Sequence, residues 1–257
     1  MSQTTSLIQD EDPYKEIFNE FAQKDNDYLT VEELQMTLNS NGYDFTLKAC
    51  NNMFIHVDED TNKRLDYEEF IKLMKFLIRM HGTFMHLDKS QLQVIKRTDL
   101  RDALKNLGYQ FSNEQFSILF NVSDINNDNR INFEEFVSMS LQLKALREIY
   151  RNALKKKARK IKQLQSTGGG GGSGSGSSSE SDELNNTQNQ NTLSNNELKN
   201  LQLDANDFDD ILKSLGIDTD INKTKNALKH FDTNHDEKMS FEEFVHFIFT
   251  VNDSGLN

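Results

Sequence analysis

The stretch Asp124-Ile-Asn-Asn-Asp-Asn-Arg-Ile-Asn-Phe-Glu-Glu135 decides how this chain of 257 residues is organised. Oxygen-bearing side chains stand at its positions 1, 3, 5, 9 and 12, and the apolar Ile131 stands at position 8. A hard cation such as Ca²⁺ takes six to eight oxygens, which a tight loop supplies from alternate side chains, one backbone carbonyl and a bidentate final Glu. The stretch fits the calcium-loop pattern D-x-[DN]-x-[DN]-G-x5-E except at position 6, where Asn129 replaces Gly.

Two further stretches, 58–69 and 232–243, repeat this design. Each begins with Asp, ends with Glu and is followed directly by Phe. Three acidic, solvated turns are the alternative, but three matches in one register argue against it. The predicted metal ligands, with a backbone carbonyl at position 7 of each loop, are Asp58, Asp60, Asn62, Arg64, Asp66 and Glu69; Asp124, Asn126, Asp128, Arg130, Asn132 and Glu135; and Asp232, Asn234, Asp236, Lys238, Ser240 and Glu243.

A weaker copy of the loop precedes each of these loops by 36 residues, at 22–33, 88–99 and 196–207. Position 8 stays apolar in all three weak copies. One helix-loop-helix unit cannot bury its own apolar face, so neighbouring units are expected to pair. We therefore predict three contacts between position-8 residues: Leu29 with Leu65, Ile95 with Ile131, and Leu203 with Met239.

On these motifs the chain resembles the EF-hand proteins of the calmodulin superfamily, and its hand count is similar to that of calbindin, calretinin and secretagogin. The resemblance implies an all-α fold of three paired EF-hand modules, six helix-loop-helix units in total, with Ca²⁺ as the bound ion. This chain departs from those relatives by degrading every odd hand and by inserting a segment before the third module. The predicted divisions are a tail (1–12), pair 1 (13–80), pair 2 (81–143), a basic amphipathic helix (144–166), a Gly/Ser/Asn-rich flexible linker (167–192), pair 3 (193–251) and a tail (252–257).

The weak copies lack ligands for identifiable reasons. Lys24 stands at position 3 of the first copy, Leu92 at position 5 of the second, and Leu198 at position 3 of the third. A distorted register through the Ala22 carbonyl stays open for the loop at 22–33. The acids that end the first and third weak loops, Glu33 and Asp207, stand three residues after an N-cap residue, which is the spacing of a capping box. We expect them to serve as helix caps.

Two further local signals concern backbone conformation. Gly42, Gly108 and Gly216 each follow a predicted helix at the same offset, where glycine enters the left-handed region without steric cost. Position 6 of a calcium loop also needs a positive φ, which costs a non-Gly residue roughly 1–2 kcal/mol. Asn tolerates this region better than Lys63 or Glu237 do, so the loop at 124–135 ranks first of the three.

The helix after the loop at 124–135 is predicted to continue into a basic segment. Between residues 144 and 162 the chain has nine Lys or Arg and one Glu. Apolar residues spaced three or four apart recur between these charges. Such a helix is typical of a calmodulin target or a membrane-surface segment. Three interpretations stay open: a solvated spacer, a helix that docks into one of the chain's own lobes, and a ligand for acidic lipids.

The composition limits the remaining functions. The net charge of -12 argues against nucleic acid as a partner. The single Cys50 excludes an internal disulfide, and we expect it to be a buried apolar residue in a cytoplasmic protein. No signal peptide, N-myristoylation site or membrane span is expected. No phosphate loop, zinc motif or nucleophile elbow is present, so we expect no enzymatic activity.

Three functions remain as alternatives. They are a calcium sensor whose Met-lined groove binds a target helix, a calcium buffer, and a calcium-regulated adaptor.

Overall fold

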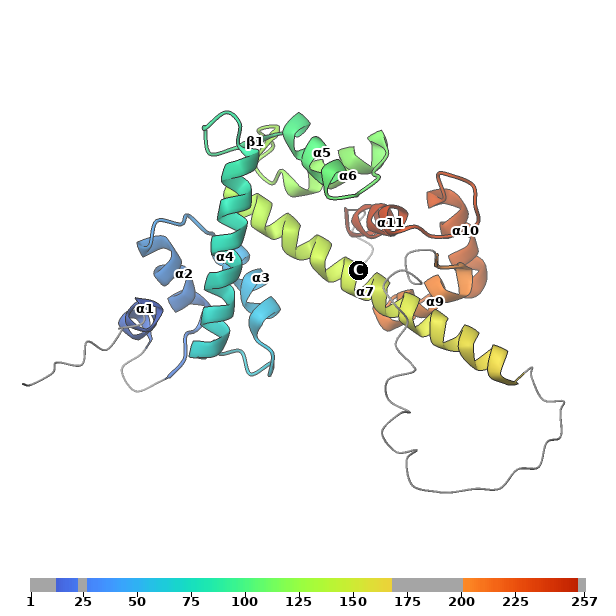
Figure 1. The fold of residues 1–257 in the computed structure, drawn as a ribbon, viewed down its shortest axis with the longest axis horizontal. Helices are drawn as coiled ribbons and strands as arrows, with labels where there is room; N and C mark the ends of the chain where they lie inside the picture. The colour runs from blue at the N-terminus through green and yellow to red at the C-terminus, as the bar shows by residue number, and fades with distance from the viewer. Residues whose placement is uncertain (1–12, 23–26, 168–200, 254–257) are drawn as a thin grey trace, which may run out of the picture. The chain divides into compact units, whose positions relative to one another are not determined.

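The computed structural model describes residues 13–22, 27–167 and 201–253, and these residues are mostly helical (Figure 1). The predicted tail at 1–12, the predicted linker from residue 168 onward, and parts of the weak loops at 22–33 and 196–207 lie outside the described residues. Helices and strands follow in the order α1 Pro13–Phe21, α2 Val31–Ser40, α3 Leu47–Val57, α4 Tyr67–Leu87, β1 Ile95–Lys96, α5 Arg97–Asn106, α6 Asn113–Ser123, β2 Arg130–Ile131, α7 Phe133–Thr167, α9 Ala205–Ser214, α10 Ile221–Phe231 and α11 Phe241–Asp253.

The chain divides into two compact units. The first comprises residues 1–109 and 120–142, and the second comprises 110–119 and 143–257. The predicted boundary between residues 80 and 81 falls inside α4, which runs without interruption for 21 residues. Its buried apolar residues continue past that point to Phe84, so one helix leaves the loop at 58–69 and leads into the loop at 88–99. Within the described residues, no helix combines the length and the apolar character needed to cross a membrane.

The core of the first unit lies among α1, α2, α3 and α4. Phe18 of α1 packs edge-on against Tyr67 and at a tilt against Phe70, both at the start of α4, with ring centroids 5.4 Å apart in each pair. Cys50 of α3 is fully buried in this core, as its apolar interpretation predicts. The first residue of α7, Phe133, stacks on Tyr43 and so brings the beginning of that helix into the same unit.

All three predicted position-8 contacts are present. Leu29 and Leu65 form an antiparallel bridge with reciprocal backbone hydrogen bonds of 2.8 and 2.9 Å. Ile95 of β1 pairs with Ile131 of β2 in a two-stranded antiparallel sheet. Leu203 and Met239 form the third antiparallel bridge. These position-8 residues are all fully buried.

The predicted helix caps are also confirmed. Thr30 and Glu33 form a capping box at the start of α2, and Asp204 and Asp207 form one at the start of α9. A residue in the left-handed region ends three helices as predicted, with φ of 87° at Gly42, 91° at Gly108 and 76° at Gly216. Short-range chemistry therefore sets where these helices begin and end.

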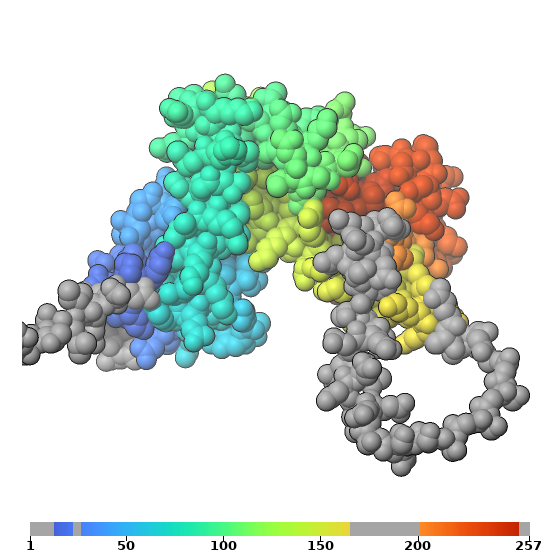
Figure 2. All heavy atoms as spheres, viewed as in Figure 1, coloured from blue at the N-terminus to red at the C-terminus, as the bar shows by residue number. Residues whose placement is uncertain are grey.

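The second unit contains α9, α10 and α11 with the part of α7 from residue 143 onward. The helix α7 has 35 residues, and no Gly or Pro interrupts it. Its buried residues in this part recur at three- or four-residue spacing: Leu143, Leu146, Tyr150, Leu154 and Ala158. Figures 1 and 2 show this part of α7 in yellow beside the orange and red residues 201–253.

Candidate metal centres

The position-1 carboxylate closes each of the three predicted loops by accepting backbone hydrogen bonds across it. In the loop at 124–135, Asp124 Oδ1 accepts from Asp128 N at 3.1 Å, and Asp124 Oδ2 accepts from Asn129 N at 2.9 Å. Asp58 accepts from the equivalent amides at 3.1 and 3.0 Å. Asp232 does so at 3.2 and 2.8 Å. The first predicted ligand is thus held in the same way in all three loops.

The position-12 carboxylate connects the start of each loop to the start of the outgoing helix. Glu135 Oε1 accepts from Ile125 N, and Glu135 Oε2 accepts from Asn132 N, both at 2.9 Å. Glu69 makes the equivalent bonds at 2.9 and 3.1 Å, and Glu243 makes both at 2.9 Å. All three side chains are buried. A Glu fixed at both oxygens inside the loop suits the bidentate role that a calcium loop gives to this position.

The side chains at position 9 cap the helices that follow the three loops. Asp66 Oδ1 and Asn132 Oδ1 each accept from the backbone N of the terminal Glu at 2.9 Å, which caps the outgoing helix. Ser240 Oγ accepts the same bond at 3.3 Å and also donates to Glu243 Oε2 at 2.8 Å. Their contribution to a metal stays a prediction, as does that of the position-7 carbonyls of Arg64, Arg130 and Lys238.

The side chains at positions 3 and 5 turn back toward their own loops. Asn126 Oδ1 accepts from Asp128 N at 2.9 Å, and Asp128 Oδ1 accepts from Arg130 N at 2.8 Å. The loops at 58–69 and 232–243 repeat both bonds. Within the described part of the chain, one group of three acids, at Asp58, Asp60 and Glu69, brings an oxygen from each within 4.8 Å of the others.

The residue type at position 3 differs between the three loops. Position 3 is Asp60 there, whereas it is Asn126 and Asn234 in the other two loops. A carboxamide oxygen also binds calcium, but it carries no net charge. The donor sets of all three loops are oxygen-only and therefore fit a hard cation such as Ca²⁺.

The backbone at position 6 adopts the left-handed conformation that the loop pattern requires. The φ angle is 59° at Lys63, 63° at Asn129 and 58° at Glu237. This outcome was predicted, together with the steric cost at the two residues that are neither Gly nor Asn. Burial raises the pKa of Glu135, and the nearby Asp124 raises it further, although three backbone amides oppose the shift. A bound cation would relieve this crowding of negative charge.

The weak loop at 88–99 retains the backbone of a calcium loop although Leu92 and Lys96 replace oxygen ligands at positions 5 and 9. Gln91 and Gln93 have φ of 56° and 59°, as the equivalent residues of the three predicted loops do. Asp88 is buried and accepts from Ser90 Oγ at 2.7 Å and from Gln93 N at 2.7 Å. At position 12, Asp99 Oδ1 accepts from Lys89 Nζ at 3.0 Å. A lysine ammonium therefore contacts the carboxylate at the position that supplies the bidentate ligand in a calcium loop.

The basic part of α7 makes ion pairs with α9. Lys157 Nζ lies 2.6 Å from Asp204 Oδ2 and 2.6 Å from Asp207 Oδ2, which are the two acids of the α9 capping box. Burial alone would raise the pKa of Asp204, but hydrogen bonds from Lys157 and from the Asp207 backbone lower it to about 2. Lys156 and Lys160 both contact Asp210 Oδ2, at 2.9 and 3.3 Å.

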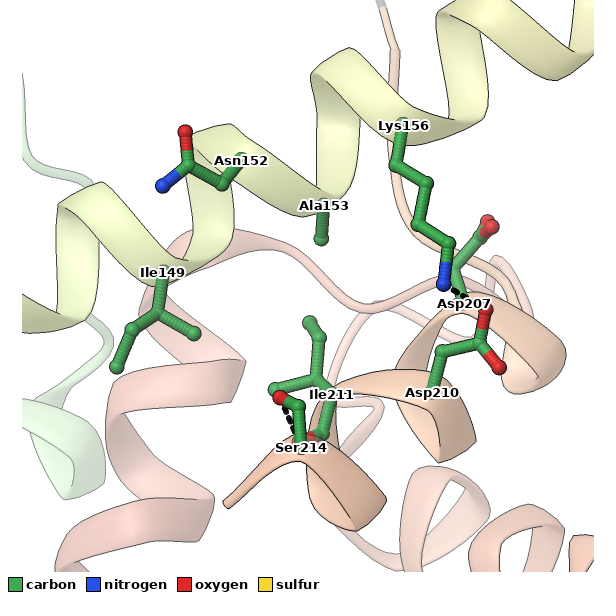
Figure 3. A pocket seen from close by; sticks show the side chains of 8 residues that line it. All are labelled: Ile149, Asn152, Ala153, Lys156, Asp207, Asp210, Ile211 and Ser214. Atoms are coloured by element: carbon green, nitrogen blue, oxygen red, sulfur yellow. Dashed lines mark hydrogen bonds and ion pairs between the residues drawn. The ribbon is translucent and has the colours of Figure 1, made fainter.

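A shallow hollow of about 290 Å³ lies beside these ion pairs (Figure 3). Figure 3 shows Ile149, Asn152, Ala153 and Lys156 of α7 along one side of it. Asp207, Asp210, Ile211 and Ser214 of α9 line the other side. Apolar residues of both helices, Ile149, Ala153 and Ile211, thus line the hollow together with the ion pair of Lys156 and Asp210.

Two residues of α7 that contact the segment 201–253 were not identified as functional candidates from the sequence. Tyr150 was predicted only as one of the apolar positions of the basic helix, yet its Oη donates to the carbonyl of Met239 at 2.8 Å. Lys157 was one of nine similar cations in the segment. Neither role has a local sequence signal, because each depends on which surface the helix meets.

Residues 11–75 and 91–143 match two family models, each described as an EF-hand domain pair. The chain is 27% identical over 132 residues to a calcium-binding protein of rice (Oryza sativa subsp. japonica), which is 49% of this chain and 78% of that protein. It is 23% identical over 148 residues to a calmodulin-like protein of the same species, covering 54% and 87% of the two chains.

A third relative is an enzyme, calcium-dependent protein kinase 34 of Arabidopsis thaliana. The chain is 30% identical to it over 131 residues, which is 49% of this chain but only 25% of the kinase. The similarity to the kinase is therefore partial. Residues 11–75 and 91–143 are therefore similar to EF-hand domain pairs, and EF-hand proteins of the calmodulin-like type bind Ca²⁺.

Proposed function

We propose that this EF-hand calcium-binding protein, which is of the calmodulin-like type, acts as a calcium sensor. In this proposal the chain has six helix-loop-helix units in three pairs, and the loops at 58–69, 124–135 and 232–243 bind calcium. The observation that carries the proposal is the common construction of the three loops. In each loop a position-1 Asp is held by two loop amides, and a position-12 Glu is held at both ends of the loop.

The third pair in this proposal is the segment 201–253. Both family matches end before it, at residue 143 or earlier. Its assignment is supported by the bridge from Leu203 to Met239, by the capping box of α9, and by the φ of 58° at Glu237. The same three features occur in the matched part of the chain. They are the bridge between Leu29 and Leu65, the capping boxes of α2 and α4, and the φ of 59° at Lys63.

A sensor needs an element that responds to calcium, and α7 is the element that we propose. It starts inside the loop at 124–135, because Phe133 precedes the ligand Glu135. Its basic part contacts the segment that carries the loop at 232–243. A change at either loop would therefore act on one continuous helix. Because Lys156, Lys157 and Lys160 are engaged with acids of α9, we favour this internal partner over acidic lipids.

A calcium buffer remains as a second candidate, and the methionines favour it. Met53, Met74 and Met139 are buried, as expected for ordinary core residues rather than an open groove. Met36 and Met85 are exposed, at 52% and 48%. A sensor would expose more apolar surface on binding calcium, whereas a buffer barely opens.

Calorimetric titration of the whole chain with calcium tests the proposal directly. We expect three sites, and single replacements Asp58→Ala, Asp124→Ala and Asp232→Ala should each remove one. Affinities of sensor loops fall roughly between 10⁻⁷ and 10⁻⁵ M. Binding of an apolar fluorescent dye should rise with calcium in the parent chain, and an unchanged dye signal would favour the buffer. Four or more sites would show that a weak loop binds as well.

A further inference from the structure

The hydroxyl of Tyr150 enters the bridge between Leu203 and Met239. Met239 N donates to Leu203 O at 2.7 Å, which is the ordinary bridge hydrogen bond. The carbonyl of Met239, however, accepts from Tyr150 Oη at 2.8 Å. The backbone of Leu203 also forms a hydrogen bond with the Tyr150 hydroxyl. A side chain of α7 therefore joins the two residues that hold this pair of loops together.

The corresponding bridge in the first unit is built from backbone alone. Leu29 N donates to Leu65 O at 2.8 Å, and Leu65 N donates to Leu29 O at 2.9 Å. The pairing of Leu203 with Met239 thus depends on a third element in a way that the pairing of Leu29 with Leu65 does not. Removing the Tyr150 hydroxyl would leave a buried carbonyl and amide to find new partners, which is costly.

The ring of Tyr150 is buried against the first turns of α11. It is 8% exposed and packs edge-on against Phe241 at 5.6 Å and at a tilt against Phe244 at 6.0 Å. Both phenylalanines belong to α11, which leaves the loop at 232–243. The guanidinium of Arg147, one turn earlier on α7, lies 5.3 Å from the centroid of Phe241. One face of α7 is therefore fitted to the helix that follows the calcium loop.

The same face of α7 is anchored two turns later. Lys157 is seven residues after Tyr150 and bridges the two acids that cap α9. Leu154 and Ala158 lie between and beside these anchors and are buried. The two polar anchors, Tyr150 and Lys157, fix the register of the helix along the surface, while the apolar residues supply contact area.

We propose that Tyr150 is a positioning residue that couples the seating of α7 to the loop at 232–243, so that calcium binding and helix seating strengthen each other. The inference rests on the proposed function of that loop. Met239 lies between Lys238 and Ser240, two predicted contributors to the site. Fixing the Met239 carbonyl restricts the loop before any ion arrives, and preorganisation of this kind raises affinity. Coupling between two binding equilibria is reciprocal, so calcium must then hold the helix more tightly.

The test uses the full chain with Asp58→Ala and Asp124→Ala, which leaves the loop at 232–243 as the remaining predicted site. Calcium affinity is measured by calorimetry, and helix seating is measured by amide hydrogen exchange of residues 146–160 with and without calcium. Tyr150→Phe keeps the ring and removes only the hydroxyl. Tyr43→Phe, in the first unit, makes the same chemical change away from this bridge and serves as the control.

We expect Tyr150→Phe to weaken calcium binding by about fivefold or more. It should also reduce the protection that calcium adds to residues 146–160. Tyr43→Phe should change neither quantity. An affinity within twofold of the parent, or calcium-dependent protection equal to that of the parent, would overturn the coupling while leaving the calcium site intact. Failure of the parent itself to bind calcium would instead overturn the proposed function of the loop.

Discussion

Replacing Lys157 with Met tests whether the basic part of α7 is held on the segment 201–253 by its charge. Met keeps most of the length and packing of the lysine stem but removes the ammonium group. Lys157 is 15% exposed and Asp207 is 9% exposed, so this ion pair is shielded from water. The replacement would leave the carboxylate of Asp207 without its cation in a largely buried position.

The magnitude follows from the two contacts of 2.6 Å that the ammonium makes. A hydrogen bond to a charged group contributes about 1.5–3 kcal/mol when it is buried. The contact with Asp204 counts for less, because that carboxylate is 36% exposed and solvent screens it. We therefore expect a loss of about 2 kcal/mol in the free energy of helix seating, which is about a 30-fold change in the equilibrium.

Amide hydrogen exchange of residues 150–160 in the full chain measures this loss, because it reports the free energy of local opening. The protection of these amides in Lys157→Met should fall by about 30-fold, which corresponds to a loss of about 2 kcal/mol. Lys155→Met is the matched control, since Lys155 forms no ion pair among the described residues. Equal protection in the two variants would refute the reasoning, because the helix would then be held by apolar contacts alone.

Three further predictions concern single groups. Lys63→Gly should raise the free energy of unfolding in urea by about 0.5–1 kcal/mol, because relief of the strain at a φ of 59° exceeds the added chain entropy of Gly. Asn129→Gly should raise this free energy by less, because Asn tolerates a positive φ better than Lys does. A larger increase in Asn129→Gly than in Lys63→Gly would contradict this prediction. Burial raises the pKa of Cys50 to about 12, so a thiol reagent should react at pH 8 only after the chain is unfolded. The pKa of Asp204 is lowered to about 2, so its contribution to stability is present above about pH 4 and lost as the pH falls toward 2; carboxyl NMR should show this pKa rising toward its usual value in Lys157→Met.

The loops and their pairing follow from the sequence because their chemistry is local and evenly spaced. Oxygen ligands at alternate positions, an apolar position 8 and an N-cap at position 9 each act within one 12-residue window. The contacts of Leu29 with Leu65 and of Leu203 with Met239 could therefore be predicted from position alone. The same reasoning placed Gly42 in the left-handed region.

Other features could not be predicted because they depend on which surfaces meet. The helix α4 passes through the predicted boundary at residue 80, since nothing in a periodic apolar pattern says that one helix serves two loops. The loop at 88–99 retains its turn without Gly at position 6, because Asp88 accepts a backbone hydrogen bond across the loop and Lys89 pairs with the carboxylate at position 12. The amphipathic pattern left open whether the basic part of α7 is a solvated spacer or packs on the chain, and Tyr150 and Lys157 acquire their roles only from the segment 201–253.

The lysines that contact Asp99 and Asp207 have a consequence for how steeply the chain would respond to calcium. Cooperativity within a pair of hands arises when the first ion makes the second easier to bind. These ammonium groups belong to the chain itself and stay beside the two carboxylates. We therefore expect the hands that contain Asp99 and Asp207 to bind no second ion. In the pairs at 88–135 and 201–243 we therefore expect a graded response, with a Hill coefficient of about one per pair. Any steeper response of the whole chain would have to come from coupling through α7 rather than from within a pair.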